Sequence, residues 1–298
     1  MDNKIVVSLF GGLGNQLFQY AVGRSLAAKN NSSLVLDLAW FNIVHELKDT
    51  TIRKYALHPF QMTTTLQYDG LPFTQKKNRI SRLASRFLYN FRQQAVPIFL
   101  EKQNFHFDRL LIEEKGPIWL SGYWQSYKYF DPFSDLIRAD IGTVGALTDA
   151  SKKIYLEIIS HDAICVHIRR GDYVSNKVAF DTHGLCGADY YDKGLDIVSS
   201  KLHDPHCYVF SDDPSWVRLN FNPSFPMTVV DVNGPDEVHQ DLWLMQACKC
   251  FVIANSSFSW WGAWLSNFGG KVVVAPKKWF ASSEFDMSDL IPNDWIMI

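Results

Sequence analysis

Two adjacent arginines, Arg169 and Arg170, are the residues of this sequence whose chemistry is easiest to interpret. They directly follow the apolar run 163–168, which includes His167, and they precede Asp172. A short β-branched run bounded by a glycine turn predicts a buried strand, so the charged residues fall at its carboxyl end. Ligands bind at that edge in open α/β sheets, and guanidinium groups match phosphate oxygens. The segment indicates an anion site; the alternative is that both arginines only pair with acids at the surface.

A second polar group follows the predicted strand 206–210, where Ser211, Asp212 and Asp213 precede Pro214. An acid before proline is a common helix start, because the carboxylate caps free amides and proline fits the first turn. The functional alternative is that one carboxylate orients Arg169 or binds a ligand hydroxyl. Two adjacent acids are few ligands for a divalent ion, and the sequence has no Asp-x-Asp motif, so we expect no metal.

A third polar group, Asn255, Ser256 and Ser257, follows the predicted strand 250–254 and opens a helix. Hydroxyls, free amides and the helix dipole all favour a phosphate there, whereas ordinary capping needs only one such residue. Upstream, Asp241 or Glu237 could accept hydrogen bonds from a guanine. The alternative for these acids is that they complement the dipole of their own helix.

The chain begins with a strand, a glycine turn and a helix: 4–9, then Gly11 to Gly14, then 15–30, with a second strand over 34–38. With Gly12 and Gly14 in the turn, the amino end of this helix would face any ligand that binds there. The third glycine of the dinucleotide fingerprint is missing, since Leu17 takes its place. The alternative is a tight strand-to-helix connection without a ligand.

Composition limits the class of protein. With 47% hydrophobic and 20% charged residues among 298, a large packed core is expected. The net charge of −2 gives no basic field for nucleic acid. The five cysteines lack metal spacing, and no signal peptide or membrane-length apolar run occurs, so we expect a reducing, cytoplasmic location. The segment 76–92 has six basic residues and helical apolar spacing, which predicts either a solvated helix face or peripheral contact with a membrane or anionic acceptor.

The second half alternates strands with helical patterns, which predicts a parallel sheet with helices on both faces. Its expected strands are 163–168, 206–210, 227–231, 250–254 and 271–275. A helical stretch over 131–160 precedes them. We therefore predict an α/β protein of two Rossmann-like domains facing a central cleft, with residues 1–155 in the first and 156–298 in the second.

The sequence resembles the short bacterial α-1,2-fucosyltransferases of glycosyltransferase family 11 over nearly its whole length. The matching segments are 11–20 (GGLGNQLFQY), 122–126 (GYWQS), 167–173 (HIRRGDY), 210–214 (FSDDP) and 255–262 (NSSFSWWG). The resemblance implies a GT-B fold, transfer of fucose from GDP-β-L-fucose to the 2-hydroxyl of a terminal β-galactoside, and inversion at the anomeric carbon. It implies no cofactor, a donor site mainly in the second domain and an acceptor between the domains.

Roles for single residues follow from the same resemblance. Arg169 would stabilise charge on the leaving β-phosphate, while Ser256 and Ser257 hold the phosphates and Asn15 lies near the reacting carbon. The other residues expected at the substrates are Gly12, Gly14, His167, Arg170, Asp212, Asp241, Asn255 and Phe258. An inverting transferase also needs a general base. Asp172 is favoured for it over His167, Asp37 and His45. Two other functions stay open: transfer from another nucleotide sugar, and non-catalytic glycan binding.

Overall fold

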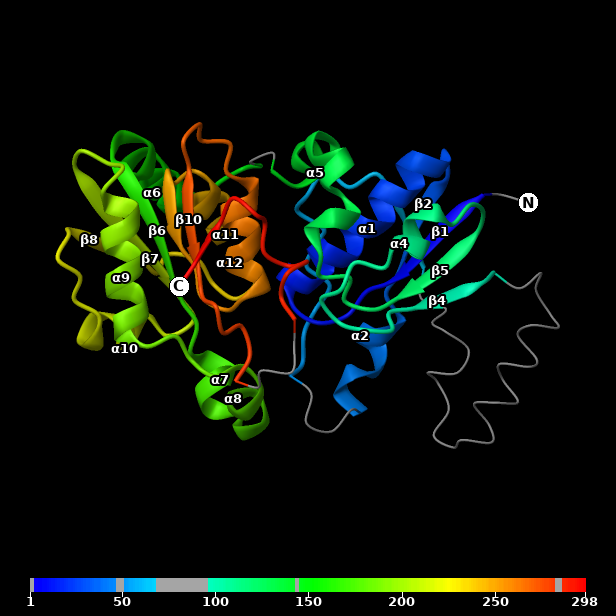
Figure 1. The fold of residues 1–298 in the computed structure, drawn as a ribbon, viewed down its shortest axis with the longest axis horizontal. Coiled ribbons are helices and arrows are strands. Elements are labelled where there is room, and N and C mark those ends of the chain that lie inside the picture. The colour runs from blue at the N-terminus through cyan, green and yellow to red at the C-terminus, as the bar shows by residue number, and fades with distance from the viewer. Residues whose placement is uncertain (1–2, 47–50, 68–95, 143–144, 282–285) are drawn as a thin grey trace. The chain divides into compact units, whose positions relative to one another are not determined.

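The computed structural model describes residues 3–46, 51–67, 96–142, 145–281 and 286–298 (Figure 1). Its contacts divide the chain into two units, Met1–Asp140 with Ser288–Leu290, and Ile141–Met287 with Ile291–Ile298. The predicted boundary at 155/156 lies 15 residues further along the chain than this division (155 − 140), inside helix α6 (Asp149–Ser160). The difference arises because α6 packs against strand β6 (Asp162–Ile168) and helix α11 (Val238–Gln246) of the second unit.

The first unit is built around a parallel sheet. Within the described ranges its strands run in the order β3-β2-β1-β5-β4. Their bounds are β1 Lys4–Ser8, β2 Ser33–Asp37, β3 Thr65–Gln67, β4 Ile98–Leu100 and β5 Ile118–Ser121. Strand order reverses between β1 and β5, so the carboxyl ends of these two strands flank the point where open sheets bind ligands.

Helix α1 (Leu13–Asn30) joins β1 to β2 and is buried on most of its surface against this sheet. It begins after Gly12 in extended conformation and ends at Asn31, whose left-handed backbone (φ 49°) closes it. The other helical elements among the described residues of this unit are α2 Ala39–Ile43, η1 Val44–Glu46, α4 Arg109–Glu113, η2 Tyr127–Tyr129, η3 Asp131–Phe133 and α5 Ser134–Ile141. The predicted helical stretch 131–160 is thus divided into η3, α5 and α6.

The second unit also holds a parallel sheet, whose described strands lie in the order β11-β10-β9-β6-β7-β8. Numbered along the unit, this order is 6-5-4-1-2-3, which is the Rossmann arrangement. The bounds beyond β6 are β7 Pro205–Ser211, β8 Met227–Val230, β9 Cys250–Val252, β10 Val272–Ala275 and β11 Ile296–Met297. All five strands predicted for this half are present, and the order reverses between β6 and β9.

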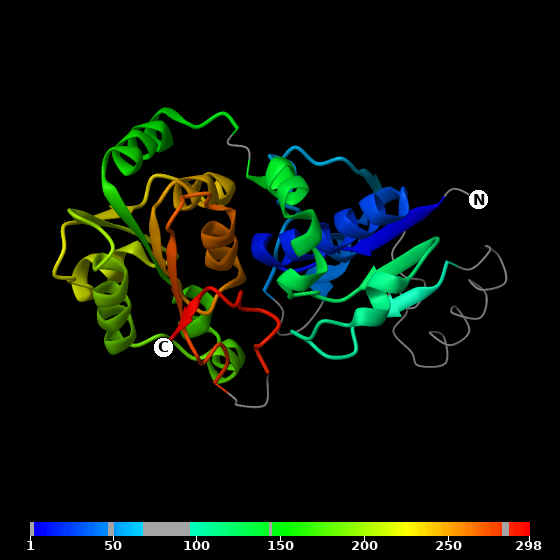
Figure 2. The same cartoon turned by 45° about the horizontal axis from the view of Figure 1, so that its top comes forward.

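Helices cover both faces of this sheet: α9 and α10 lie on one side and α11 and α12 on the other (Figures 1 and 2). Tyr191, Leu195 and Val198 of α9 pack on the buried strand residues, including Val166 and Val252. The bounds of the helices not yet given are α7 Gly171–Ser175, α8 Lys177–His183, α9 Ala188–Ser199, α10 Pro214–Asn220 and α12 Ser257–Leu265. This rigid core fixes where each strand ends, and therefore where the polar residues after it lie.

Candidate active site

The three predicted polar groups of the second unit lie at one edge of its sheet. Strands β7, β6 and β9 are parallel neighbours, with Ile168 opposite Ser211 and Val166 opposite Val252. Each polar group begins within a few residues of its strand's last residue. The sequence-based prediction that the groups share an edge is therefore confirmed, and they flank the reversal of strand order between β6 and β9.

Arg169 is held by a carboxylate from the neighbouring strand. Its Nη1 lies 2.8 Å from Asp212 Oδ2, and its guanidinium carbon lies 5.2 Å from the centre of the Tyr173 ring. The backbone N–H of Arg170 donates to Asp212 Oδ1 at 2.8 Å. Both side chains of the ion pair are partly exposed, 21% for Arg169 and 26% for Asp212. Asp212 thus orients Arg169 while leaving part of it accessible, which is what a ligand-binding arginine needs.

Arg170 has a different environment. Its Nε lies 3.5 Å from Asp213 Oδ2, and its guanidinium carbon lies 3.8 Å from the centre of the Trp216 ring. Asp213 also accepts a hydrogen bond from the N–H of Trp216 at 3.1 Å, and Pro214 occupies the first turn of α10. The helix-capping interpretation therefore applies to Asp213, and the interpretation that a carboxylate orients Arg169 applies to Asp212.

His167 is buried rather than presented to a ligand. Its side chain is 4% exposed, its ring lies 5.9 Å from that of Phe258, and its Nδ1 has no hydrogen-bond partner within the described part of the chain. Burial holds the pKa of His167 well below its usual range; the nearby Arg169 also lowers it, and Asp212 opposes the shift. The imidazole is therefore neutral at physiological pH and packs beneath the site.

The Asn255 side chain is directed into the protein. Its Nδ2 donates to the carbonyls of His183 at 2.8 Å and Trp279 at 3.1 Å, and the residue is 2% exposed. Its donors therefore join the end of α8 to the segment at Trp279, and we do not retain it as a phosphate ligand. Of the three side chains expected to bind phosphate, Ser256 and Ser257 stay candidates.

Ser256 and Ser257 begin helix α12. Ser256 is the N-cap but makes no side-chain capping bond within the residues described, and the first turn contains no acid. Ser256 is buried and Ser257 is half-buried. The hydroxyls, the first-turn amides and the dipole of a nine-residue helix make this a suitable place for an anion.

Asp241 lies in the first turn of α11, beyond the end of β8. Its Oδ1 accepts from Asn233 Nδ2 at 2.7 Å, and Asn233 in turn accepts from the Ser151 hydroxyl at 2.7 Å. Burial raises the pKa of Asp241 to about 6, with smaller contributions from neighbouring acids. Glu237, the alternative candidate, accepts from the N–H of Gly234 at 3.2 Å and closes a turn. The assignment of Asp241 to a guanine stays a prediction.

The glycine turn of the first unit lies at the corresponding edge of its own sheet. Gly11 has φ +78°, and a side chain there would bring a Cβ within 2.7 Å of Asn15 Nδ2. Gly12 precedes α1 and Gly14 is buried in its first turn. Asn15 Oδ1 accepts from Gln125 Nε2 at 2.7 Å, so the turn after β1 is tied to the loop after β5.

Two glutamines of α1 that the sequence reasoning missed hold this loop in place. Gln16 and Gln19 are fully buried. Gln16 donates to the carbonyls of Gly11 and Lys54, both at 2.9 Å, and accepts from the N–H of Ala56. Gln19 accepts from the N–H of Phe10 at 3.1 Å. Polar residues at apolar positions of a helix were the signal for this role, because buried amides need partners.

Aromatic rings gather at the same edge of the first sheet, which composition alone did not reveal. The Phe10 ring follows β1 and lies 4.9 Å from Tyr123, which follows β5, and 6.4 Å from Trp40 of α2. Phe10 and Trp40 are half-buried and Tyr123 is exposed. Exposed aromatic faces beside polar loops provide a suitable surface for a sugar.

The candidates for a general base have unequal environments. His167 is buried, as described above, Asp37 is 3% exposed, and the His45 residue of η1 is exposed. Asp172 lies in α7, but its side chain is outside the described residues. Its assignment as the base therefore stays a prediction.

Two further observations concern what the described residues contain. They hold no group of three His, Cys, Asp or Glu side chains arranged to bind a metal ion. No helix among them has the length and apolar character to cross a bilayer. The predicted basic helix 76–92 lies outside the described residues, so its proposed contact with a membrane stays a prediction.

Comparison with known proteins agrees with the geometry. The sequence is 33% identical over 300 residues to the alpha-1,2-colitosyltransferase of Escherichia coli, covering 99% of this chain and 98% of that protein. It is also 33% identical to the E. coli O-antigen biosynthesis glycosyltransferase WbnK, covering 97% and 98%. A galactoside 2-alpha-L-fucosyltransferase of Caenorhabditis elegans is 32% identical over 163 residues, 48% of this chain and 41% of that one.

Solved structures share the fold. A mutant of Arabidopsis thaliana FUT1 in complex with GDP matches with a TM-score of 0.52 at 13% identity, covering 92% of this chain and 70% of that one. The NodZ alpha-1,6-fucosyltransferase soaked with GDP-fucose matches with a TM-score of 0.50 at 13% identity, covering 89% and 93%. The predicted α/β class with two Rossmann-like domains of GT-B type is confirmed. Residues 4–298 match the family described as Glycosyl transferase family 11, and the chain is a glycosyltransferase that belongs to this family.

Proposed function

We propose that this enzyme transfers L-fucose from GDP-β-L-fucose to the 2-hydroxyl of a terminal β-galactoside, inverting the anomeric carbon to give an α-1,2 linkage. The observation that carries the proposal is the arginine that Asp212 orients at the reversal point of a Rossmann sheet. Ligands of such sheets bind at this point, and a fixed guanidinium suits a diphosphate. The names of relatives in the family supply the sugar and the linkage.

The second unit would bind the donor. Arg169 would stabilise the negative charge that develops on the β-phosphate as the bond to the fucosyl carbon breaks. Ser256, Ser257 and the first amides of α12 would hold the diphosphate oxygens, and Asp241 would accept from the guanine. Arginine and helix amides supply positive charge in this proposal, so transfer is expected to continue in the presence of EDTA.

The first unit would bind the acceptor. Asn15, fixed by Gln125, would lie near the reacting carbon, and the rings of Phe10, Trp40 and Tyr123 would contact the sugar. The hydroxyl groups of a carbohydrate form hydrogen bonds with amide side chains, and its C–H faces pack on aromatic rings. These assignments are supported by the position of all five residues at the carboxyl edge of the first sheet.

A second candidate differs in the transferred sugar. A relative that is 33% identical over 99% of the chain is an alpha-1,2-colitosyltransferase, so a colitosyl donor is the alternative to fucosyl. Turnover of the two nucleotide sugars under the same conditions decides between them. A higher kcat/KM with the colitosyl donor would replace the fucosyl assignment.

The function is tested by titrating GDP calorimetrically into EDTA-treated protein and by following transfer from GDP-fucose to a panel of galactosides. We expect GDP to bind in the micromolar range and fucoside to form without added metal. Strict loss of transfer in EDTA would refute the metal-free chemistry. Glycan binding with neither GDP binding nor turnover would instead indicate a carbohydrate-binding protein.

A further inference from the structure

Glu101 is an acidic residue that the sequence analysis did not single out, and it lies at the carboxyl edge of the first sheet. It directly follows β4, and its N–H donates to the carbonyl of Ser121 at 3.0 Å. Its carboxylate accepts the backbone N–H groups of Tyr123 at 2.6 Å and Trp124 at 3.1 Å. Two hydrogen bonds from the loop after β5 therefore fix the position of this carboxylate.

The loop after β5 is shaped around the Glu101 side chain. A Cβ on Gly122 would lie 2.3 Å from the Cβ of Glu101, so a side chain cannot be accommodated there without displacing Glu101. Trp124 has φ +55°, a backbone conformation that costs energy for a bulky residue, and it is 1% exposed. Strain of this kind is concentrated at functional sites, because the surrounding structure must hold it.

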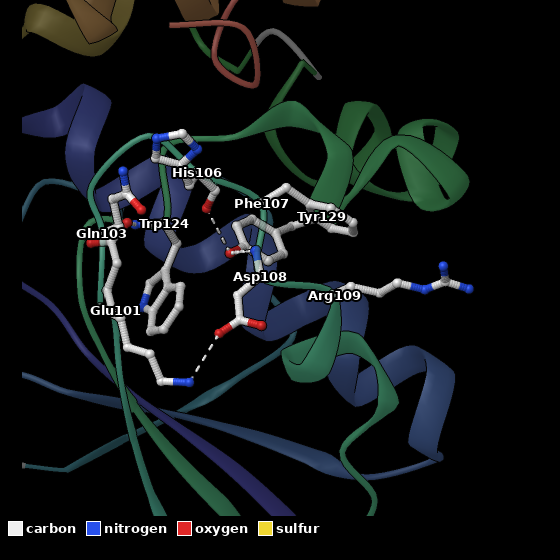
Figure 3. A pocket seen from close by; sticks show the side chains of 9 residues that line it. Glu101, Gln103, His106, Phe107, Asp108, Arg109, Trp124 and Tyr129 are labelled. Carbon is white, nitrogen blue, oxygen red and sulfur yellow. Dashed lines mark hydrogen bonds and ion pairs between the residues drawn. The ribbon is translucent and has the colours of Figure 1, made fainter. Parts of the chain in front are cut away.

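Glu101 also lines a cavity of about 340 Å³ (Figure 3). The other described lining residues are Lys102, Gln103, His106, Phe107, Asp108, Arg109, Trp124 and Tyr129. The cavity therefore combines the half-buried ring of Phe107 with amide and charged side chains, while the rings of Trp124 and Tyr129 are almost fully buried behind it. This combination fits a sugar ring, whose C–H faces pack on aromatic rings while its hydroxyls form hydrogen bonds.

Burial gives this carboxylate the proton affinity that a base needs near neutral pH. It raises the pKa of Glu101 to about 7, although the two backbone N–H groups lower it. A catalytic pKa near the working pH makes proton transfer most effective. Several titratable or charged groups lie around Glu101. One is Tyr123, whose backbone N–H donates to the carboxylate; the others line the cavity and are Lys102, His106, Asp108, Arg109 and Tyr129.

We propose that Glu101, in place of Asp172, is the general base that accepts the proton of the acceptor hydroxyl. The acceptor oxygen forms its bond to the anomeric carbon while its proton passes to a carboxylate oxygen of Glu101. The bond between that carbon and the β-phosphate oxygen breaks, and its electron pair leaves with GDP. The inference rests on the proposed transfer reaction and names the proton acceptor that this reaction requires.

The test compares Glu101→Gln with the wild type and with Glu114→Gln. The control makes the same chemical change at an exposed position of the first unit. kcat/KM for the acceptor is measured from pH 5.5 to 8.5 at saturating donor, together with GDP affinity. We expect Glu101→Gln to lose about 10²–10⁴-fold, a typical contribution of a general base. The wild type and the control should show a limb rising with pH through about 7, and Glu101→Gln should lack it. GDP affinity should be unchanged.

The pH limb separates catalysis from a structural role, since a residue that only orders the loop would lower activity at every pH alike. Activity of folded Glu101→Gln within threefold of the wild type, with the limb retained, would overturn the proposal. If Glu101→Gln does not fold, Glu101→Asp decides. A loss of tenfold or more with the limb retained at a shifted pH supports the proposal, and wild-type activity at all pH values overturns it. The comparison uses whichever donor the wild type turns over, so failure of GDP-fucose refutes the donor and leaves the test of Glu101 intact.

Discussion

Replacing Arg169 by alanine tests the centre of the proposed donor site. The guanidinium lies 2.8 Å from Asp212 Oδ2 and over the Tyr173 ring, so its direction is fixed before any ligand binds. Such a group has no reorganisation to undergo when charge develops on the leaving phosphate. Its removal should therefore slow the chemical step more than it weakens binding of the ground state.

The size of both effects follows from this geometry. Removing one fixed donor aimed at a developing charge costs about 2.7–4 kcal/mol, so kcat should fall about 10²–10³-fold. A charged hydrogen bond to the ground-state diphosphate contributes about 1.5–3 kcal/mol, so the Kd for GDP should rise about 10- to 100-fold. The free energy of unfolding should fall by no more than about 1 kcal/mol, because the ion pair is partly exposed and Asp212 keeps its bond from Arg170 N–H.

Steady-state transfer, GDP calorimetry and denaturant unfolding measure the three quantities on the same preparation. Arg169→Lys serves as the matched variant, because it keeps the charge but loses the planar fork. It should fall between the wild type and the alanine variant in kcat. A folded Arg169→Ala enzyme with kcat within threefold of the wild type would refute the assigned role.

Three further predictions concern neighbouring residues. Asn255→Ala removes the donors to the carbonyls of His183 and Trp279, and thermal or denaturant unfolding should show a loss of about 1–3 kcal/mol in the free energy of unfolding. Because burial depresses the pKa of His167 in the folded protein, protonation favours the unfolded chain. The free energy of unfolding should therefore fall as pH drops below about 6.5, by up to about 1.4 kcal/mol per pH unit. Denaturant unfolding of His167→Gln over the same pH range should show a smaller dependence on pH. Asp241→Asn should raise the Kd for GDP about tenfold or more and leave that for inorganic diphosphate unchanged in calorimetry, whereas equal losses for both ligands would exclude a contact with the base.

The edge that carries the site could be predicted from the sequence because it depends on strand ends. The apolar runs before Arg169, Asp212 and Asn255 are long or β-branched, and parallel strands bring their carboxyl ends to one edge. Predicting that these residues share an edge did not require knowing the order of the strands in the sheet. The alternation of strands and helices likewise determined the fold class.

The direction of single side chains could not be predicted, because their partners come from distant parts of the chain. Asn255 was expected at a phosphate, but it donates to carbonyls 72 and 24 residues away. Glu101 was overlooked because β4 has three residues, too few for a recognisable pattern, and its carboxylate acquires its position only when β4 pairs with β5. The contact-based division at 140/141 differs from the predicted boundary for a related reason, since the packing of α6 on β6 cannot be read from helix periodicity.

A structural and a functional arginine would both pair with Asp212 as Arg169 does. The distinction lies in coupling. If Asp212 serves only the fold, Asp212→Ala should lower stability, and its effect on kcat should add to that of Arg169→Ala. If Asp212 acts by orienting Arg169, the double variant should be no slower than Arg169→Ala alone, because the oriented group is already absent. A double-mutant cycle in kcat measures this coupling, and residues in contact typically couple by about 0.5–3 kcal/mol. Strict additivity with intact fold would assign the carboxylate to the strand-end turn, where it accepts from Arg170 N–H.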